Sequence, residues 1–526
     1  MISRRNFIGA TAGTAALAQS RPPTARLRGI MLDAARLPES IEYYHRFIDF
    51  CSQWGYNAIL FRLTDDQGCA MRFESHPELM THANALSARE AADLAGYARR
   101  RGIMLIPEME SFGHTRFITA VPRYAAFEDG DPSRKGFGGI CPVHPEAIQI
   151  VQDLYREASR VFPSPYFHGG CDEVNWGYSE RSRQAIAAAS REKVWAGYVN
   201  SLAALARSLG KEFIIWGDVV AHKEPAILPL LDKSAIVMDW QYYVTDPAPL
   251  HATAQALMED GRRVMGAAAI ISCKWGPRCS EEQLRNIDAF ADAYASLEGA
   301  ANLGVVITNW MPTRYIARSM WDTYAYGGAA LRRGGAYARA SAFPAFVRQF
   351  YGAKWRPAWE DVFAAYYRAA PARPNCAARW RGPVLPNPWA TDKELHAALG
   401  EKPGVVPGFP ELRSKIEALE PTVRRNAGDF SAFALSAEYL EHLYWRDAAV
   451  RSKPEPAVLE TIARRDATLT AKLDAEWNVS RPPDSPGKRE TLLQLGPQDQ
   501  LLFRMRQAAA YSAEAARDPE RLRQVL

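Results

Sequence analysis

YFHGGCDEVNW, residues 166–176, changes character halfway along its length. It is apolar up to Phe167, and it then carries a histidine, two glycines and two adjacent acids, Asp172 and Glu173. A short apolar run that ends in polar residues is typical of a buried strand that reaches the edge of its sheet. The stretch therefore predicts a strand over 166–171 and places two carboxylates at its carboxyl end.

Seven other short apolar runs alternate with helical patterns up to residue 310. They are RGIMLD (28–33), NAILFRL (57–63), IMLIPEM (103–109), EFIIWGD (212–218), SAIVMDW (234–240), RRVMGAA (262–268) and GVVITNW (304–310). These runs are apolar on both alternating faces, as expected for strands covered on both sides. Eight strand–helix units favour an α/β fold, a (β/α)8 TIM barrel over residues 25–350, with an open doubly wound sheet as the alternative.

The pattern changes from about residue 356 onward, where segments with helical spacing are separated by Pro-rich links. The segments are WEDVFAAYYRAA, ELRSKIEALEP, AEYLEHLYWRDAAV and LLFRMRQAAAY. We therefore expect a helical C-terminal region over 356–526 that packs on the barrel.

The N-terminus has the order of elements of an export signal. Arg4 and Arg5 precede an apolar stretch that ends in the small-residue site Ala16-Leu17-Ala18. The SRRNF pattern resembles a twin-arginine signal, and the apolar stretch is too short to cross a bilayer. We expect residues 1–18 to be a twin-arginine signal peptide, no membrane span in the rest of the chain, and a periplasmic or secreted mature protein.

Composition and spacing give no support for several other classes of function. The net charge of +5 arises from 64 basic and 59 acidic residues that are interspersed, so no nucleic-acid surface is expected. No GxGxxG opens a helix, which argues against dinucleotide binding, and the seven cysteines include no CxxC. We therefore expect no metal and no cofactor, and disulfide pairing stays open, with Cys273 and Cys279 as one possible pair.

Chemistry in a (β/α)8 barrel lies at the carboxyl ends of the strands, and here those ends are rich in acids and tryptophan. The polar and aromatic residues at these ends are Asp33, Arg36, Asp65, Asp66, Glu108, Glu110, His114, His168, Asp172, Glu173, Trp216, Asp218, Asp239, Trp240, Gln241, Tyr242, Tyr243, Asn309 and Trp310. Tryptophan faces stack on the C–H faces of sugar rings, while carboxylates and arginine bind the hydroxyls. Convergent polar groups in an aromatic-lined cavity indicate a small-molecule site, and sugars fit this one best.

These residue types also have structural roles that a sequence does not separate from chemistry. Asp65 and Asp66 fit a solvated turn or a helix cap, and His114 fits a structural histidine. Asp172 and Glu173 fit a helix N-cap followed by a first-turn acid.

The motif HGGCDEV (168–174) resembles the H-x-G-x-D-E signature of glycoside hydrolase family 20, the β-N-acetylhexosaminidases. The resemblance extends over the barrel through DAAR (33–36), RLTDDQG (62–68), RGIMLIPEMESFGH (101–114) and ICPVHPEA (140–147). It is closest to the hexosaminidase D-like branch. That branch lacks the family's usual N-terminal α/β domain, for which this sequence is expected to leave no room.

The resemblance implies a substrate-assisted retaining mechanism, an exception to the use of two catalytic carboxylates. The 2-acetamido oxygen of the sugar attacks C1, so no side chain acts as the nucleophile. Glu173 is then the general acid and base, which requires a raised pKa that burial or a neighbouring negative charge provides. Asp172 stays ionised, accepts the acetamide N–H and stabilises the positive charge.

The same resemblance assigns the remaining roles. Arg36 binds hydroxyls of the terminal sugar, and Asp65 or Asp66, with His114, orients Glu173. The residues that wall the N-acetyl pocket are Trp216, Trp240 and Trp310.

The sequence departs from the family pattern at three places. AAAIISCKWG (267–276) lacks the seventh-strand tyrosine, which makes Tyr242 or Tyr243 the candidate to position the acetamide oxygen. Met311 and Pro312 follow Trp310, where an acid is common two residues on, and Cys69 stands where an aromatic is common.

These features predict an exported, exo-acting β-N-acetylhexosaminidase that hydrolyses terminal GlcNAc or GalNAc. Its partner is an N-acetylhexosamine-containing glycan or oligosaccharide, and its oligomeric state stays open. The alternatives are a family-20-like glycosidase with altered specificity and a non-catalytic sugar-binding protein. The intact Asp172–Glu173 pair favours catalysis, since a binding protein gains nothing from a buried, protonatable acid.

Overall fold

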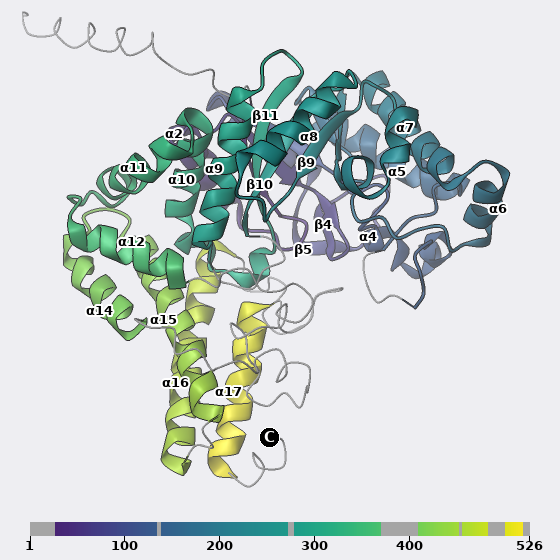
Figure 1. Ribbon diagram of the computed structural model, residues 1–526. Coiled ribbons are helices and arrows are strands. Elements are labelled where there is room, and N and C mark those ends of the chain that lie inside the picture. The colour runs from purple at the N-terminus through teal and green to yellow at the C-terminus, as the bar shows by residue number, and fades with distance from the viewer. Residues whose placement is uncertain are drawn as a thin grey trace, which may run out of the picture.

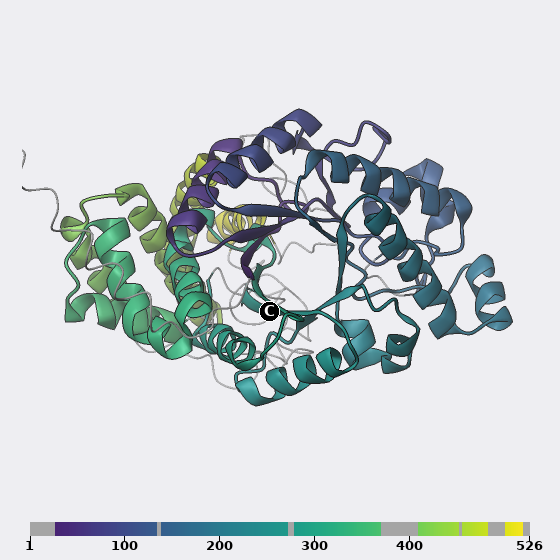
Figure 2. The ribbon, with the colours of Figure 1, turned by 90° about the horizontal axis from the view of Figure 1, so that it is seen from above.

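The computed structural model describes residues 27–133, 138–271, 278–369, 409–451, 455–481 and 500–518. Eight parallel strands close a barrel in the order β1-β11-β10-β9-β8-β7-β6-β2 (Figures 1 and 2). The strands are β1 (Leu27–Leu32), β2 (Ala58–Arg62), β6 (Met104–Glu108), β7 (Tyr166–His168), β8 (Glu212–Trp216), β9 (Ile236–Trp240), β10 (Val264–Ile271) and β11 (Asn302–Asn309). Each apolar run contributes one strand, so the predicted (β/α)8 barrel is confirmed.

Helices surround the barrel, as the view in Figure 2 shows. They are α2 (Ile41–Gln53), α3 (Ala88–Arg100), α5 (Pro145–Val161), α6 (Glu180–Ala188), α7 (Arg191–Ser208), α8 (Pro247–Glu259), α9 (Glu281–Ser296) and α10 (Trp321–Arg333). Helix α3 begins in a capping box, in which Ser87 and Glu90 satisfy each other's backbone N–H groups. Helical periodicity then turns one apolar stripe of each helix toward the strands.

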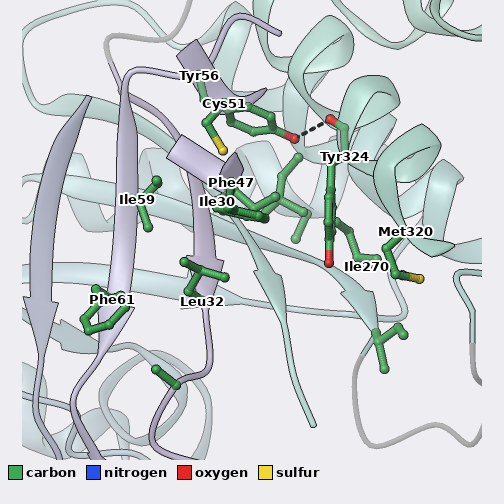
Figure 3. Packing of buried hydrophobic residues seen from close by; sticks show 14 of the residues in the cluster. Ile30, Leu32, Phe47, Cys51, Tyr56, Ile59, Phe61, Ile270, Met320 and Tyr324 are labelled. Atoms are coloured by element: carbon green, nitrogen blue, oxygen red, sulfur yellow. Dashed lines mark hydrogen bonds between the residues drawn. The ribbon is translucent and has the colours of Figure 1, made fainter. Parts of the chain in front are cut away.

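Two apolar layers hold the barrel because successive strand residues point to opposite faces. Met31 of β1 faces the barrel interior, whereas its neighbours Ile30 and Leu32 belong to the outer layer. Figure 3 shows Ile30 beside Phe47 of α2, and Leu32 belongs to the same apolar cluster. The burial of both faces explains why the strand segments are apolar without alternation.

One hydrogen bond in the outer layer joins two segments that lie far apart in sequence. The Tyr56 hydroxyl donates to the backbone carbonyl of Tyr324 at 2.7 Å, as Figure 3 shows. This bond satisfies a buried hydroxyl and ties the start of β2 to α10.

A small sheet follows β2 and shapes the loop above it. It pairs β3 (Thr64–Asp65) with β4 (Gly68–Met71) in antiparallel fashion and β4 with β5 (Thr81–Leu86) in parallel. Gly68 has φ of +144°, a backbone region that favours glycine, at the turn between β3 and β4. The short strand β3 and this turn place Asp65 and Asp66 just after the end of β2.

Short helices occupy the loops at the carboxyl ends of several strands. They are α4 (Arg116–Thr119), η2 (Pro122–Phe127), η3 (Asp218–Lys223), η4 (Pro225–Leu230), η5 (Pro312–Arg314) and η6 (Ala317–Ser319). Of these, η3 carries Asp218 and Lys223, which lie at the candidate site described below.

Further helices continue from α10 and extend to one side of the barrel (Figure 1). They are α11 (Gly335–Phe346), η7 (Val347–Tyr351), α12 (Pro357–Ala369), α14 (Phe409–Leu419), η8 (Glu420–Thr422), α15 (Ala427–Arg451), α16 (Pro456–Ser480) and α17 (Leu501–Arg517). Ion pairs join this region to the barrel: Asp429 of α15 lies 2.6 Å from Arg46 of α2, and Glu476 of α16 lies 2.6 Å from Arg318 of η6.

The predicted signal peptide, residues 1–18, lies outside the described residues, as does Cys273. Among the helices of the described ranges, none is both long enough and apolar enough to cross a bilayer.

Candidate active site

The sequence-predicted residues meet in one connected network at the carboxyl ends of the strands. Asp172 and Glu173 contact His114, which contacts Asp66. Asp65 contacts Arg36, and the Arg36 guanidinium lies 4.9 Å from the centre of the Trp310 ring. The other predicted aromatic residues, Trp216, Trp240 and Tyr242, pack with Trp310 in the barrel interior.

The chain after β7 turns Asp172 and Glu173 toward the same imidazole. Cys171 and Glu173 have φ of +72° and +46°, a left-handed conformation that is uncommon for residues other than glycine. His114 Nε2 lies 3.2 Å from Glu173 Oε2 and 3.8 Å from Asp172 Oδ2. Adjacent side chains on a regular strand point to opposite faces, so the two acids converge only because the strand has ended. Such backbone strain is concentrated at functional sites.

A tight turn after β6 positions His114. A Cβ on Gly113 would lie 2.2 Å from the backbone oxygen of Asp172, so only glycine fits there. His114 itself has φ of +50°, and its Nδ1 lies 3.3 Å from Asp66 Oδ2. The other oxygen of Asp66 accepts from the backbone N–H groups of Arg116 and Gly138, at 3.0 and 3.3 Å.

The charges around His114 favour its protonated form. Burial alone would lower the pKa of His114, but the charge of Asp172 and the hydrogen bonds to Asp66 and Glu173 raise this pKa well above its ordinary value. These partners favour the protonated form of His114, which contacts both candidate acids.

The imidazolium sets the protonation of Glu173. Burial raises the pKa of this carboxyl, but the hydrogen bond and charge of His114, with the charges of Lys223 and Arg36, outweigh burial and lower the pKa. The expectation that Glu173 has a raised pKa is therefore wrong for the ligand-free site. The side chain is 36% exposed, so solvent reaches the carboxyl from the mouth of the site.

Sequence reasoning missed Arg62, the fully buried last residue of β2. Its guanidinium contacts Asp65 and Glu110, and its Nε lies 2.9 Å from Glu108 Oε2. Asp33 Oδ1 lies 3.6 Å from Nη1. The signal was present in NAILFRL, because a charge inside a buried apolar run requires buried partners.

One guanidinium does not neutralise all these acids. Burial, with the charges of Asp172 and Asp33, raises the pKa of Glu108 to about 7 against the opposing effect of Arg62. Burial and the charge of Asp172 likewise raise the pKa of Glu110. Glu110 Oε2 and Asp172 Oδ1 are buried and accept no hydrogen bond from the described part of the chain.

The adjacent acids Asp65 and Asp66 divide their partners. Asp66 is the closer to His114, at 3.3 Å against 3.9 Å for Asp65. Asp65 instead pairs with the arginines, and its Oδ2 lies 3.1 Å from Arg36 Nη2. Asp33 also pairs with Arg36, with 3.2 Å between its Oδ2 and Arg36 Nη1. The sequence left open which aspartate meets the histidine, and the structure favours Asp66.

An aromatic wall fills the barrel next to these charges. Trp216 is fully buried, with its ring centre 5.8 Å from that of Trp310. The Trp310 indole N–H donates to the Tyr242 hydroxyl at 3.0 Å, and Trp240 stacks on Tyr242 with ring centres 4.9 Å apart. The tyrosine hydroxyl from the sixth barrel strand therefore lies at the aromatic wall.

Asp218 and Lys223 of η3 support Glu173 from the side. Asp218 Oδ2 accepts from the Glu173 backbone N–H at 3.2 Å and from Lys223 Nζ at 2.6 Å. Burial and the charge of Asp172 raise the pKa of Asp218 to about 6. The sequence placed Asp218 at a strand end without a role, and it gave no signal for Lys223.

Among the residues that the structure describes, two sets of side chains bring metal-ligand atoms within 4.8 Å of one another. One is Asp65, Asp66 and His114, and the other is Glu110, His114 and Asp172. The same carboxylates pair with Arg62, Arg36 and the His114 imidazolium. The cations at this site are therefore side chains of the protein itself, and we assign no metal to it.

Comparisons with known proteins bear on the barrel. Residues 26–271 match the sequence profile "Glycosyl hydrolase family 20, catalytic domain". A β-hexosaminidase of Vibrio furnissii is 27% identical over 251 residues, which are 40% of this chain and 41% of that protein. A β-hexosaminidase of Akkermansia muciniphila is 27% identical over 167 residues, 28% of this chain and 34% of that protein. The matched region thus spans less than half the length of either relative.

The GH20 exo-β-N-acetylglucosaminidase of Vibrio harveyi, solved in complex with N-acetylglucosamine, is 19% identical. The alignment covers 60% of this chain and 54% of that chain, with a TM-score of 0.46.

Proposed function

We propose that the protein is an exported, exo-acting β-N-acetylhexosaminidase, because residues 26–271 match the model of the glycosyl hydrolase family 20 catalytic domain. It would release terminal GlcNAc or GalNAc by a substrate-assisted retaining mechanism. The observation that carries the proposal is the convergence of Asp172 and Glu173 on His114 beside a wall of buried tryptophans. The names of the relatives support the substrate class, and the twin-arginine-like N-terminus supports export.

Glu173 is the general acid and then the general base. In the ligand-free site its carboxyl and the His114 imidazole lie 3.2 Å apart, and the charges favour the proton on the imidazole. A sugar that covers the exposed part of Glu173 removes water from the pair, which favours the neutral acid over the ion pair. The acid then protonates the leaving oxygen, and afterwards the carboxylate activates water.

Asp172 steadies the acetamide group of the substrate. Its Oδ1 is buried and accepts no hydrogen bond from the described residues, so it is available to the substrate N–H. A carboxylate at that position also stabilises the positive charge that develops when the acetamide oxygen attacks C1. The absence of a protein nucleophile is the feature that separates this mechanism from the two-carboxylate one.

Sugar recognition falls to the remaining strand ends. Arg36, held by Asp33 and Asp65, presents a pre-oriented guanidinium to ring hydroxyls. Trp310 supplies the apolar wall for the N-acetyl group and the ring, and the fully buried Trp216 packs against Trp310. The Tyr242 hydroxyl is our candidate to position the acetamide oxygen, and its contact with Trp310 keeps it at the wall.

The decisive measurement is release of nitrophenol from the β-GlcNAc and β-GalNAc conjugates. Glu173→Gln should lower kcat by about 10³-fold, within the range that general acid–base catalysis contributes, while a thiazoline inhibitor still binds. The matched control is Glu180→Gln on α6, whose side chain is 68% exposed and forms an ion pair with Arg183; it should retain full activity. Sugar binding without hydrolysis by the wild type would instead identify a binding protein.

A shift in specificity is the second candidate, and one position favours it. Met311 stands between Trp310 and Pro312 with φ of +62°, and its N–H donates to Asp33 Oδ2 at 3.0 Å. Pro312 occupies the position two residues after Trp310, where many members of the resembled family carry an acid that contacts the sugar. A set of nitrophenyl substrates that differ at C2 and C4 separates the two proposals by their kcat/KM ratios.

Export has its own test. Replacement of Arg4 and Arg5 by lysine should retain the protein in the cytoplasm, because the twin-arginine signal requires the arginine pair. Cell fractionation with an activity assay measures the result, and unchanged export would contradict this part of the proposal.

A further inference from the structure

The last turn of α16 reaches back to the barrel through one buried arginine. Arg481, 2% exposed, follows α16 directly, and its guanidinium lies 3.7 Å from the centre of the Trp477 ring. Its Nη2 donates to Glu39 Oε1 at 2.7 Å and to the Pro312 backbone oxygen at 3.0 Å. The backbone adds a bond beside it, from Ser40 N–H to the Ser480 oxygen at 2.7 Å.

The two groups that Arg481 joins belong to the loops that carry sugar-site residues. Glu39 lies three residues after Arg36 in the loop that follows β1, and Pro312 lies two residues after Trp310 in the loop that follows β11. Arg36 and Trp310 are in contact, with 4.9 Å between the guanidinium carbon and the ring centre. One side chain from the C-terminal helices therefore spans the ends of both loops.

The contact is chemically specific and fully inside the protein. Glu39 is 7% exposed, and a buried carboxylate requires a charged or hydrogen-bonding partner. The backbone oxygen of Pro312 also needs a donor, and a planar guanidinium serves two acceptors at fixed angles where an ammonium on a flexible chain does not. The N-terminal residues of α17, Gln500, Leu501 and Leu502, are buried as well, so the end of the helical region is not a loose appendage.

We propose that Arg481 is a positioning residue that fixes Arg36 relative to Trp310, so that the C-terminal helices complete the sugar-binding end of the barrel. This inference rests on the proposed function, since Arg36 and Trp310 are its sugar contacts. Loss of the guanidinium lets the two loops separate, which weakens the hold on the sugar ring. Glu173 and Asp172 are attached to other loops and keep their geometry.

Arg481 joins only the sugar-binding loops and not those of Asp172 and Glu173, so its loss should affect KM more than kcat. Arg481→Met should raise KM for the nitrophenyl N-acetylhexosaminide about ten-fold while kcat changes by less than about three-fold, because binding is lost and the chemical step is not. Arg481→Lys should recover part of the loss. Glu39→Gln keeps the shape of the partner, and combined with Arg481→Met it should add little, because both changes remove the same contact.

A matched control comes from the same helix. Arg318 and Glu476 also join α16 to the barrel, with contacts of 2.8 and 2.6 Å and side chains that are 16% and 11% exposed. Glu476→Gln weakens the docking of α16 at Arg318, which lies six positions after Pro312 in the loop that follows β11, and it removes no contact to Glu39 or Pro312. It should lower the melting temperature as much as Arg481→Met and leave KM unchanged.

Two results would overturn the inference. One is an equal rise of KM in Glu476→Gln and Arg481→Met, which would show that only docking of the helix matters. The other is a wild-type KM in Arg481→Met; if that variant does not fold, a wild-type KM in both Arg481→Lys and Glu39→Gln overturns the inference instead. Binding of N-acetylglucosamine-thiazoline to the same variants, measured by calorimetry, repeats the test without turnover. A wild type that neither hydrolyses nor binds would overturn the proposed function and this inference together.

Discussion

Two buried charge clusters in this protein have opposite balances of charge. The Arg62 cluster, at the barrel mouth, sets one guanidinium against Asp33, Asp65, Glu108 and Glu110. The Asp466 cluster, among α15, α16 and α17, sets one carboxylate against His442, Arg446 and Ser512. Both centres are fully buried, and in each a single charged group contacts several partners.

The balance of charge decides the direction of the pKa shifts. In the Arg62 cluster, burial and surplus negative charge raise the pKa of Glu108 to about 7. In the Asp466 cluster, burial also raises the pKa of the carboxyl, but the charge of Arg446 and the hydrogen bonds of His442 and Ser512 outweigh burial and lower this pKa to about 2. Burial by itself therefore does not predict whether a buried acid is protonated. The charges and hydrogen bonds around the carboxyl decide the direction of its pKa shift.

The clusters also differ in the acceptors that they leave open. Both oxygens of Asp466 receive hydrogen bonds. At the barrel mouth, Glu110 Oε2 and Asp172 Oδ1 are buried without a hydrogen bond from the described residues. A buried acceptor without a donor is costly, and such groups persist in native proteins where a ligand supplies the donor. The open carboxylate oxygens support the proposed sugar site at the barrel mouth. In the Asp466 cluster a ring nitrogen, His442 Nδ1, is instead buried without a hydrogen bond from the described residues.

The largest expected effect is on Asp172, which borders the open cluster. Asp172→Asn should lower kcat/KM for the N-acetylglucosaminide by about 10²–10³-fold, because the developing positive charge loses its counterion. Activity on the plain β-glucoside should change little. Steady-state kinetics on both conjugates measures the ratio, and an equal loss on both substrates would contradict substrate assistance.

Asp466→Asn should act on stability alone. Removal of the charge leaves Arg446 without its counterion in a buried site, which costs about 3 kcal/mol in free energy of unfolding. The pKa of Asp466 is lower in the folded protein than in the unfolded chain, so its contribution is present above about pH 4 and disappears as pH falls toward about 2. Denaturant unfolding of the wild type and the variant should show that their difference in free energy of unfolding disappears between neutral and strongly acidic pH. The kcat/KM of the variant at neutral pH should equal the wild-type value.

Glu108→Gln should have the opposite pH dependence. The pKa of Glu108 is higher in the folded protein, about 7, than in the unfolded chain, so its ionisation costs stability as pH rises from about 4.5 to 7. The glutamine variant should match the wild type near about pH 4 and exceed it by about 1–3 kcal/mol at about pH 8. If the stability advantage of Glu108→Gln over the wild type became smaller with rising pH in the same unfolding assay, surplus negative charge at the barrel mouth would be contradicted.

The smallest expected effect is a shift of the pH profile in His114→Asn. The imidazolium lowers the pKa of Glu173, so its removal raises this pKa and keeps the acid protonated to higher pH. The alkaline limb of kcat/KM should move up by about one pH unit, together with a lower maximum from lost orientation. An unmoved limb would mean that His114 does not control the protonation of Glu173.

Local pattern was enough to predict the barrel and the identity of the two central acids. Strand period and apolar content extend over a few neighbouring residues, so all eight strands appeared in the sequence, as did the polar strand ends. The strand-end rule then placed Asp172 and Glu173 beside the aromatic residues. The same reasoning was wrong about the pKa of Glu173, because the cation that lowers it comes from the loop after a different strand.

The pattern of residues along the chain specified the set of elements and the chemical types at their ends, because periodicity is a property of neighbours in sequence. Three contacts depended on the folded arrangement: Asp66 rather than Asp65 faces His114, Arg62 contacts acids from several strands, and Arg481 meets Glu39 across 442 positions. Charge and hydrogen bonding depend on distance in space, which the order of residues does not specify.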